Sequence, residues 1–267
     1  MIKLSIIVSY YKALDNLKLI LKALNHQSVA AFEVLISEDD NNLETVDFLK
    51  KEAQNYSFPI LHLNQKVDNG FRKNEMLNKS IKASNSDTLV FIDGDCIPHK
   101  HFVKAYQKNI QTGFMLKGRR VNLGEKITKK IQNSRALHPL NIWSILKSKT
   151  NKKKEAFYTA PFSLIVSMKN KGLLGCNWGI KKEHLLQING FDEDYIKAAV
   201  GEDTDIEWRL KSIGIGSISV KNKAIVYHLY HAKGYSMEDV LHNRKILAKK
   251  LKDNFFVCKN GLKKIPS

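Results

Sequence analysis

The sequence predicts an α/β fold built on a mostly parallel sheet with helices on its faces. Short apolar segments typical of buried strands alternate with amphipathic helical segments through the first hundred residues. This alternation favours right-handed βαβ crossovers, which make neighbouring strands parallel. A chain of 267 residues with 43% hydrophobic and 26% charged residues is also long and apolar enough to bury a full core.

The expected elements of the first half follow from the spacing of apolar residues. In residues 14–25, Leu17, Ile20, Leu21 and Leu24 fall on one helical face. Short runs rich in Val, Ile and Phe indicate strands, and the polar clusters between them indicate where the strands end. The predicted strands are 4–9, 32–36, 60–63 and 88–92, and the predicted helices are 14–25, 46–56 and 75–83.

The second half carries fewer signals. Residues 114–160 are basic and irregular, apart from an apolar stretch at 137–146 that contains Trp143. We expect a helix that opens at the acidic turn 201–205 and ends at Gly214. A strand near 224–227 and an amphipathic helix over 236–251 are also expected.

Two carboxylates, Asp93 and Asp95, come directly after the apolar run 88–92. Alternate residues of an extended chain share a face, and Gly94 permits a sharp turn and a close approach. Polar residues also follow the first two predicted strands, and ligands of parallel sheets bind at this carboxyl edge. Hard oxygen donors there suit Mg²⁺ or Mn²⁺ carrying a diphosphate. The alternative is a simple Asp-Gly turn.

The net charge of +18 is the outlier of the composition. A chain this basic is attracted to polyanions such as nucleic acid, an anionic membrane, or phosphorylated glycans and nucleotides. A lysine-rich solvated surface is the alternative. The basic runs lack interleaved aromatic residues and no nucleic-acid-binding signature is visible, so no nucleic-acid partner is expected. Trp143, beside the basic stretch 147–154, suits either a membrane interface or the core.

The cellular location is predicted from three sequence features that are absent. It has no apolar run long enough to cross a bilayer, and its first residues read as a strand rather than as a signal peptide. Cys96, Cys176 and Cys258 are isolated, which supports neither a disulfide framework nor a cysteine metal site. We expect a cytoplasmic protein, with the inner face of the membrane as a candidate peripheral location.

Four motifs in order resemble glycosyltransferase family 2, which are inverting enzymes of the GT-A fold. They read SIIVSYY from Ser5, FEVLISEDD from Phe32, VFIDGD from Val90 and GEDTD from Gly201. The segments GCNWGIKK from Gly175 and INGFDE from Ile188 are also similar to the C-terminal part of galactosyltransferase-like members. The resemblance spans about residues 4 to 231.

On the nucleotide side, the resemblance implies roles for five residues. Ser9 and Tyr11 would line a uracil pocket, and Glu38 and Asp39 would form the acidic pair after the second strand. Asp39 would hold the base or the ribose, and Arg72 would approach the nucleotide or its phosphates. The alternative for 39–41 is an Asx-rich turn with helix capping.

The resemblance also implies a metal site. Asp93 would touch the ribose and the metal, and Asp95 would bind the metal that bridges the diphosphate. Either His228 or His231 matches the position of a histidine that completes the site, and we favour His228. The alternative is that the histidine has a purely structural role. Nitrogen together with carboxylates suits Mn²⁺, with Mg²⁺ as the alternative.

On the acceptor side, the resemblance makes Asp203 the catalytic base. An inverting transfer needs one carboxylate to take the proton of the acceptor hydroxyl, and we prefer Asp203 to Asp205. Glu202, Trp178 and Asn177 would contact the acceptor. The alternatives are helix capping for the acidic residues and a core position for Trp178.

The prediction is thus an inverting, metal-dependent glycosyltransferase that moves a hexose or N-acetylhexosamine from a UDP-sugar to a glycan hydroxyl. A surface polysaccharide or lipopolysaccharide is the expected acceptor. We divide the chain into a nucleotide-sugar-binding half (1–100), an acceptor-binding half of the same domain (101–235) and a C-terminal helical tail (236–267). A nucleotidyltransferase and a catalytically dead basic binding protein are the alternatives.

Overall fold

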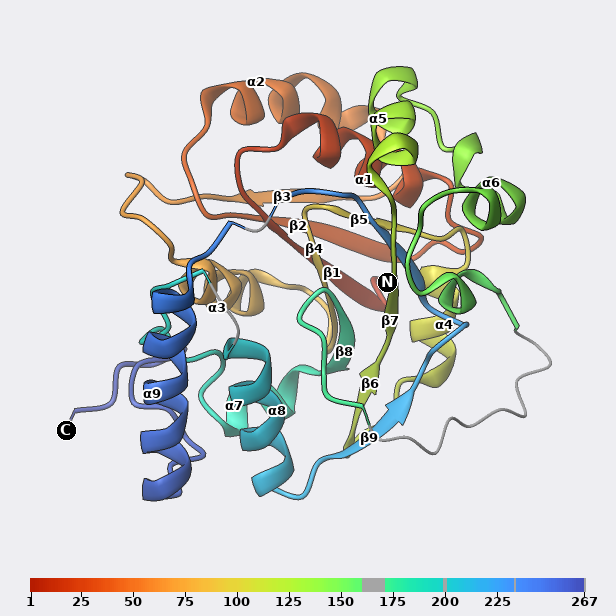
Figure 1. Cartoon of the computed structure of the whole chain (residues 1–267). Helices are drawn as coiled ribbons and strands as arrows, with labels where there is room; N and C mark the ends of the chain where they lie inside the picture. Colours follow the sequence, from red (N-terminus) through yellow and green to blue (C-terminus); the bar gives the residue numbers. More distant parts are fainter. Residues whose placement is uncertain (160–170, 199–200, 233, 267) are drawn as a thin grey trace.

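The computed structural model describes residues 1–159, 171–198, 201–232 and 234–266. Its centre is a seven-stranded sheet in the order β3-β2-β1-β4-β8-β6-β9 (Figure 1). The first four strands of this order are parallel, whereas β8 runs antiparallel to both β4 and β6. The predicted α/β fold with a mostly parallel sheet is confirmed. The strands are β1 (Leu4–Tyr10), β2 (Phe32–Glu38), β3 (Ile60–Leu63), β4 (Thr88–Asp93), β6 (Phe114–Lys117), β8 (Asn177–Lys181) and β9 (Gly216–Ser219).

Helices cover both faces of this sheet because its strands are apolar on both sides. Ile6 and Val8 of β1 pack on one face with α1 and α4, and Ile7 packs on the other face with α3, α7 and α8. Figure 1 shows the two layers, with α1 and α2 on one side and α3, α7 and α8 on the other. These helices are α1 (Leu14–Asn25), α2 (Leu43–Glu52), α3 (Lys73–Ala83), α4 (Phe102–Asn109), α7 (Lys182–Gln187) and α8 (Glu202–Ser212).

A second sheet of three strands, β5 (Cys96–Pro98), β10 (Ile225–His228) and β7 (Arg119–Asn122), joins distant parts of the chain. Cys96 pairs with His228, and His228 pairs with Asn122. The residues just after β4 are thereby fixed beside the end of β10. β7 is followed by α5 (Glu125–Ser134), α6 (Ile142–Lys147) and the short 3₁₀ turns η2 (His138–Leu140) and η3 (Lys153–Ala156).

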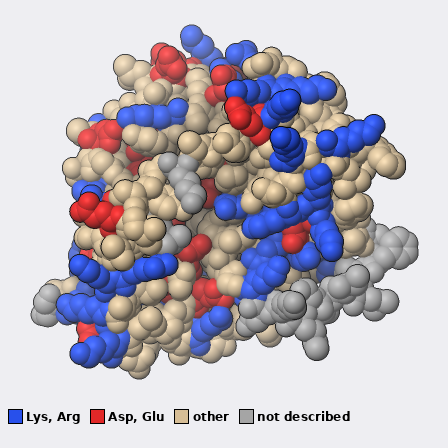
Figure 2. All heavy atoms as spheres, viewed as in Figure 1, with Lys and Arg blue, Asp and Glu red and all other residues tan. Residues whose placement is uncertain are grey.

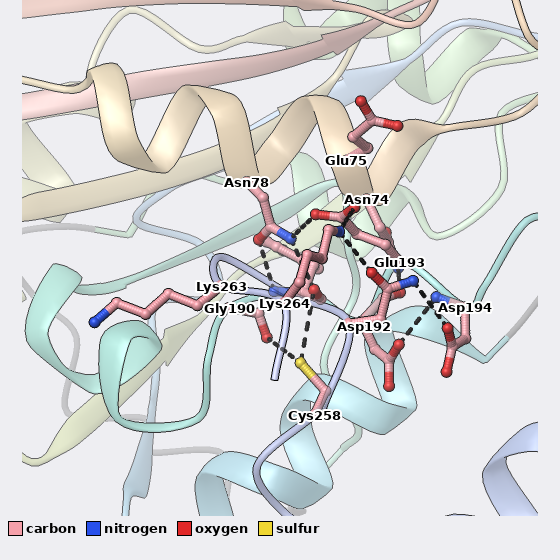
Figure 3. Close-up of polar contacts among 12 residues, drawn as sticks. Asn74, Glu75, Asn78, Gly190, Asp192, Glu193, Asp194, Cys258, Lys263 and Lys264 are labelled. Carbon is pink, nitrogen blue, oxygen red and sulfur yellow. Dashed lines mark hydrogen bonds and ion pairs between the residues drawn. The ribbon is translucent and has the colours of Figure 1, made fainter. Parts of the chain in front are cut away.

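The C-terminal segment is helical only in its first part. α9 (Met237–Asp253) opens with a capping box between Ser236 and Asp239, and the chain after it folds back onto the loop that follows α7. Figure 3 shows this loop held from two sides. Asn78 of α3 donates to the carbonyl of Phe191 at 2.8 Å, and Cys258 from the tail lies against the carbonyl of Gly190. The INGFDE segment therefore has a structural role, fixing the loop that precedes α8.

Several element boundaries differ from the prediction by one to four residues, and both ends of α2 are among them. α2 begins at Leu43 instead of residue 46 because the Asn42 side chain caps it by accepting from the Thr45 amide at 3.1 Å. It ends at Glu52, and the turn η1 (Ala53–Asn55) follows. α8 ends before Gly214, as predicted. β4 from residues 1–100 pairs with β8 from residues 101–235, so the two predicted halves share one sheet.

Candidate active site

A cleft of about 650 Å³ opens at the carboxyl ends of β1 and β4. Ser9 and Asp93 are paired in the register of these two strands, so both reach this edge. The predicted residues that line the cleft are Ser9, Tyr11, Asp39, Asp93 and Asp95. His231 and Lys73 join them there. The carboxyl edge of the sheet therefore gathers most of the predicted nucleotide-side residues into one cavity.

The main chain at Gly94 approaches the main chain at Ser9 so closely that only glycine fits there. Its amide donates to the carbonyl of Ser9 at 2.6 Å, and a Cβ at this position would lie 3.0 Å from the same oxygen. A larger residue would push the end of β4 away from β1. The glycine thus sets the position of both Asp93 and Asp95.

Asp95 lies in a cluster with two histidines. The same carboxylate oxygen, Oδ2, is 3.3 Å from Nε2 of His228 and 3.0 Å from Nε2 of His231. The ligand atoms of the three residues lie within 4.8 Å of one another. Burial raises the pKa of Asp95, but the His231 hydrogen bond and the charge of His228 outweigh burial and lower it, which favours the carboxylate. One carboxylate with two imidazoles fits Mn²⁺.

This cluster changes the predicted ligand set in two ways. His228, the favoured histidine, lies in the cluster, and His231 joins it because both rings reach Asp95. Asp93 lies outside the cluster, and its Oδ1 accepts from Nζ of Lys73 at 3.1 Å. The physical reason is that Asp95 lies at the start of the β5–β10 pairing, whereas Asp93 ends β4 and faces α3.

Lys73 bridges two carboxylates and was missed by the sequence analysis. Its Nζ lies 3.1 Å from Asp93 and 3.5 Å from Oε1 of Glu202. Burial lowers the pKa of Lys73, but Asp93 and Glu202 outweigh that effect and raise it, so the amine stays charged. The available signal was its position beside Arg72 in the loop that enters α3.

A narrow pocket of about 10 Å³, room for one water molecule, adjoins the cleft on the side of α8. Ser9, Lys73 and Asp93 line both cavities, and Glu202 and Asp203 line the narrow one. α8 begins after Gly201, whose φ of 145° is a backbone conformation open to glycine. Burial raises the pKa of Glu202, with Lys73 opposing the shift. The start of α8 thus brings two carboxylates to the inner end of the cleft.

Asp205, two residues further along, belongs to the core. Its side chain is 1% exposed and accepts from Arg209 at 2.7 Å. Lys250 of α9 lies 3.5 Å from it and also pairs with Asp192. Asp205 therefore joins α8 to the tail, whereas Asp203 faces the pocket.

Two nucleotide-side expectations need correction. Glu38 is fully buried and pairs with Nε2 of His62 at 2.6 Å, because the last side chain of β2 turns towards β3. The Arg72 guanidinium folds back onto the carbonyl of Phe71 at 2.8 Å. Only the Arg72 amide meets the site, donating to Asp39 at 2.9 Å. Asp39 also accepts from Gln65, and its burial raises its pKa to about 6.

Two acceptor-side expectations also fail. Trp178 is 1% exposed and stacks on Phe91 with ring centroids 4.6 Å apart, so its ring face is not available to a sugar. Asn177 is fully buried and accepts from the hydroxyl of Tyr106 at 2.6 Å, while its amide donates to two carbonyls. Both residues lie on β8 in the middle of the sheet, which explains their burial.

Comparison with known proteins identifies the chain's relatives. A family model described as glycosyl transferase family 2 matches residues 5–173, and one described as the N-terminal domain of galactosyltransferase matches residues 160–232. A comparison with curated proteins finds no match.

Several solved glycosyltransferase structures share the fold. A mannosyltransferase from Pyrobaculum calidifontis, PcManGT, solved with GDP-Man and Mn²⁺, is 15% identical, with a TM-score of 0.61 over 94% of this chain and 64% of that one. Residues 1–349 of TarS from S. aureus, solved with UDP, are 16% identical, with a TM-score of 0.59 over 94% and 65%. GalNAc-T7, solved with UDP, GalNAc and Mn²⁺, is 10% identical, with a TM-score of 0.61 over 96% and 50%.

The chain thus spans less than two thirds of each of these structures. Their likeness confirms the GT-A fold. The match of the first family model covers more than half of the sequence and includes the cleft residues from Ser9 to Asp95, whereas α8 and His231 fall in the match of the second. By this match, the chain belongs to glycosyl transferase family 2.

Proposed function

We propose that the protein is an inverting glycosyltransferase that moves a hexose or N-acetylhexosamine from a UDP-sugar to a glycan hydroxyl. The observation that carries the proposal is that the two cavities adjoin and share three lining residues. Ser9, Lys73 and Asp93 line both the large cleft and the pocket that holds Asp203. A nucleotide diphosphate in the cleft would thus present its sugar to a carboxylate, as an in-line transfer requires.

Asp203 is the base of this proposal. It lies in the first turn of α8, where its negative charge interacts favourably with the helix macrodipole. From there it takes the proton of the acceptor hydroxyl as that oxygen attacks the anomeric carbon. Glu202, held by Lys73, would orient the acceptor. Asp205 is unavailable for this role because Arg209 holds it in the core.

The nucleotide would be held from three sides. Asp39 accepts from the base or the ribose, Tyr11 is 54% exposed over the cleft, and Asp93 with Lys73 lies towards the sugar. Asp95, His228 and His231 would hold Mn²⁺ or Mg²⁺. When bound, the ion supplies positive charge opposite the leaving diphosphate. That PcManGT and GalNAc-T7 were solved with Mn²⁺ supports this choice.

The acceptor and the location are proposed from the net charge of the chain. The net charge of +18 favours an anionic acceptor such as a surface polysaccharide or lipopolysaccharide, assembled at the inner face of the membrane. Residues 1–100 would supply the donor side, 101–235 the acceptor side, and 236–267 the support for the loop before α8.

A UDP-release screen tests the proposal. The full chain is incubated with common UDP-sugars and GDP-mannose, with and without Mn²⁺, and Asp203→Asn serves as the matched control. Release from a UDP-sugar that needs Mn²⁺ and is lost in Asp203→Asn, with UDP binding intact, supports the transferase. Turnover that chelator leaves unchanged, or that Asp203→Asn retains, contradicts it.

A further inference from the structure

Helix α6 has one face anchored in the core and one face in solvent. Ile145 is fully buried. Trp143, Leu146 and Lys147 follow the i, i+3, i+4 spacing of a single helical face and point outward. Trp143 is 72% exposed, so the core position considered for it is wrong. An exposed tryptophan next to an exposed leucine is a costly arrangement for a face that meets only water.

The surroundings of this face are strongly basic. From residue 126 to residue 154 the sequence has nine Lys and Arg residues and no acidic residue. Figure 2 shows Lys and Arg gathered over α5, α6 and the segment after α6. Glu155, the next acid along the chain, is 8% exposed and lies 3.5 Å from Lys221. We call the outward residues Trp143, Leu146, Lys147, Lys149 and Lys154 the α6 surface.

Apolar and basic side chains occur together on the α6 surface, and this indicates which class of anionic partner it binds. A soluble polyanion would need only the lysines, and its binding would leave Trp143 and Leu146 in water. A bilayer offers both phosphate headgroups for the lysines and an interfacial layer in which tryptophan is favoured. Among the described residues, no helix is long and apolar enough to span a bilayer. We propose that the α6 surface docks peripherally on an anionic lipid bilayer, with Trp143 in the headgroup layer.

The α6 surface is tied to the candidate active site by backbone hydrogen bonds. Asn151 and Asn122 exchange two of them, at 2.9 and 3.2 Å, and Asn122 pairs with His228 across β7 and β10. The amide of Tyr230 donates to the hydroxyl of Thr128 in α5 at 2.9 Å. Docking would therefore hold the histidine cluster at a fixed height above the lipid. This last step rests on the proposed function and implies a lipid-linked acceptor.

Vesicle sedimentation of the full chain tests the docking without substrate or metal. The vesicles are phosphatidylcholine alone or phosphatidylcholine with phosphatidylglycerol. We expect binding only to the anionic vesicles and a blue shift in tryptophan emission that is lost in Trp143→Ala, since Trp143 is exposed whereas Trp178 is buried and Trp208 is half-buried. Lys147→Gln/Lys149→Gln/Lys154→Gln should weaken binding by about fivefold for each lysine removed. Trp143→Ala should weaken it about tenfold.

The matched control removes the same charge from α9, where Lys245, Lys249 and Lys252 are exposed. The variant Lys245→Gln/Lys249→Gln/Lys252→Gln should bind anionic vesicles nearly as well as the unaltered chain. Equal losses from both triple variants would overturn the proposal, because binding would then follow net charge alone. Binding to soluble polyphosphate with no effect of Trp143→Ala on vesicles would assign the surface to a polyanion instead. Circular dichroism melts confirm that each variant is folded.

Discussion

The ammonium of Lys73 contacts the carboxylate of Asp93 at 3.1 Å, and this contact joins the start of α3 to the end of β4. The same ammonium lies 3.5 Å from Glu202 at the start of α8. One side chain therefore connects the donor side of the cleft with the acceptor side. The positive charge of Lys73 offsets the repulsion between the two carboxylates.

Replacing Lys73 should loosen this junction. We expect Lys73→Met to lower the free energy of unfolding by about 2 kcal/mol, less than for a fully buried pair because Asp93 and Glu202 are partly exposed. UDP affinity should fall as well. Urea denaturation and UDP titration measure the two effects. Lys79→Met, which breaks an exposed pair with Glu75 on the same helix, should cost only about 0.5 kcal/mol.

The two aspartates of the first turn of α8 should behave in opposite ways. Asp205→Asn leaves the buried Arg209 guanidinium without its charge partner and should cost about 3 kcal/mol in unfolding free energy. Asp203→Asn should change stability by about 0.5 kcal/mol at most and reduce turnover at least about 100-fold. Thermal melts and UDP-release rates separate the variants. A stable but active Asp203→Asn protein would refute the assignment of the base.

Mn²⁺ affinity should depend on Asp95 and both histidines. We expect Asp95→Asn, His228→Ala and His231→Ala each to weaken Mn²⁺ binding at least about tenfold, because each removes one ligand atom of the cluster. Asp93→Asn should have a smaller effect in the absence of nucleotide, since Asp93 is paired with Lys73. Paramagnetic resonance of free Mn²⁺ measures the affinity. His242→Ala, on the exposed side of α9, is the control.

Nucleoside binding should depend on pH through Asp39. Burial raises its pKa to about 6, and protonation removes an acceptor from the cleft. Uridine affinity, measured without metal, should fall through Asp39 by about tenfold for each pH unit below 6. Asp39→Asn should flatten the profile, whereas Asp47→Asn, exposed on α2, should leave it unchanged. A pH-independent affinity for the unaltered chain would contradict the role of Asp39.

The same shift acts on folding in the opposite direction. The pKa of about 6 lies above the ordinary value of 3.8, so the native state binds this proton more readily than the unfolded chain does. The stability contributed by Asp39 is fully present below about pH 3.8 and is lost as the pH rises through 6. Subtracting the stability profile of Asp39→Asn from that of the unaltered chain isolates this contribution.

Local pattern was sufficient to place most elements and the edge where the site forms. The helix at 14–25 and the strand at 60–63 were predicted with their observed ends, because their apolar periodicity is uninterrupted. The prediction that Tyr11, Asp39, Asp93 and Asp95 share one edge follows from strand parallelism, and they line one cleft. Helix starts were less accurate, since a cap such as Asn42 depends on a single side-chain contact.

The direction in which each side chain points could not be predicted from the sequence pattern. Glu38 and Asp39 are neighbours in the sequence, yet one pairs with His62 on β3 and the other faces the cleft. Trp178 and Asn177 lie in the segment that matches the galactosyltransferase model, where contact with the acceptor was expected. Both residues are buried because β8 runs through the middle of the sheet. Lys73 was overlooked because its two partners lie 20 and 129 positions away in the chain.

The sequence by itself determined the fold class and the order in which acidic residues arrive at the sheet edge, since these depend on periodicity and spacing along the chain. It indicated the family through the resemblance of four motifs. Only the tertiary structure decided which side chains the acidic residues meet. Asp95 lies beside two histidines because β5 pairs with β10 across more than a hundred residues. Asp93 pairs with Lys73 because the first residue of α3 lies against the end of β4. Such contacts depend on how segments far apart in the sequence fold against one another, and no local sequence pattern specifies which segments will meet.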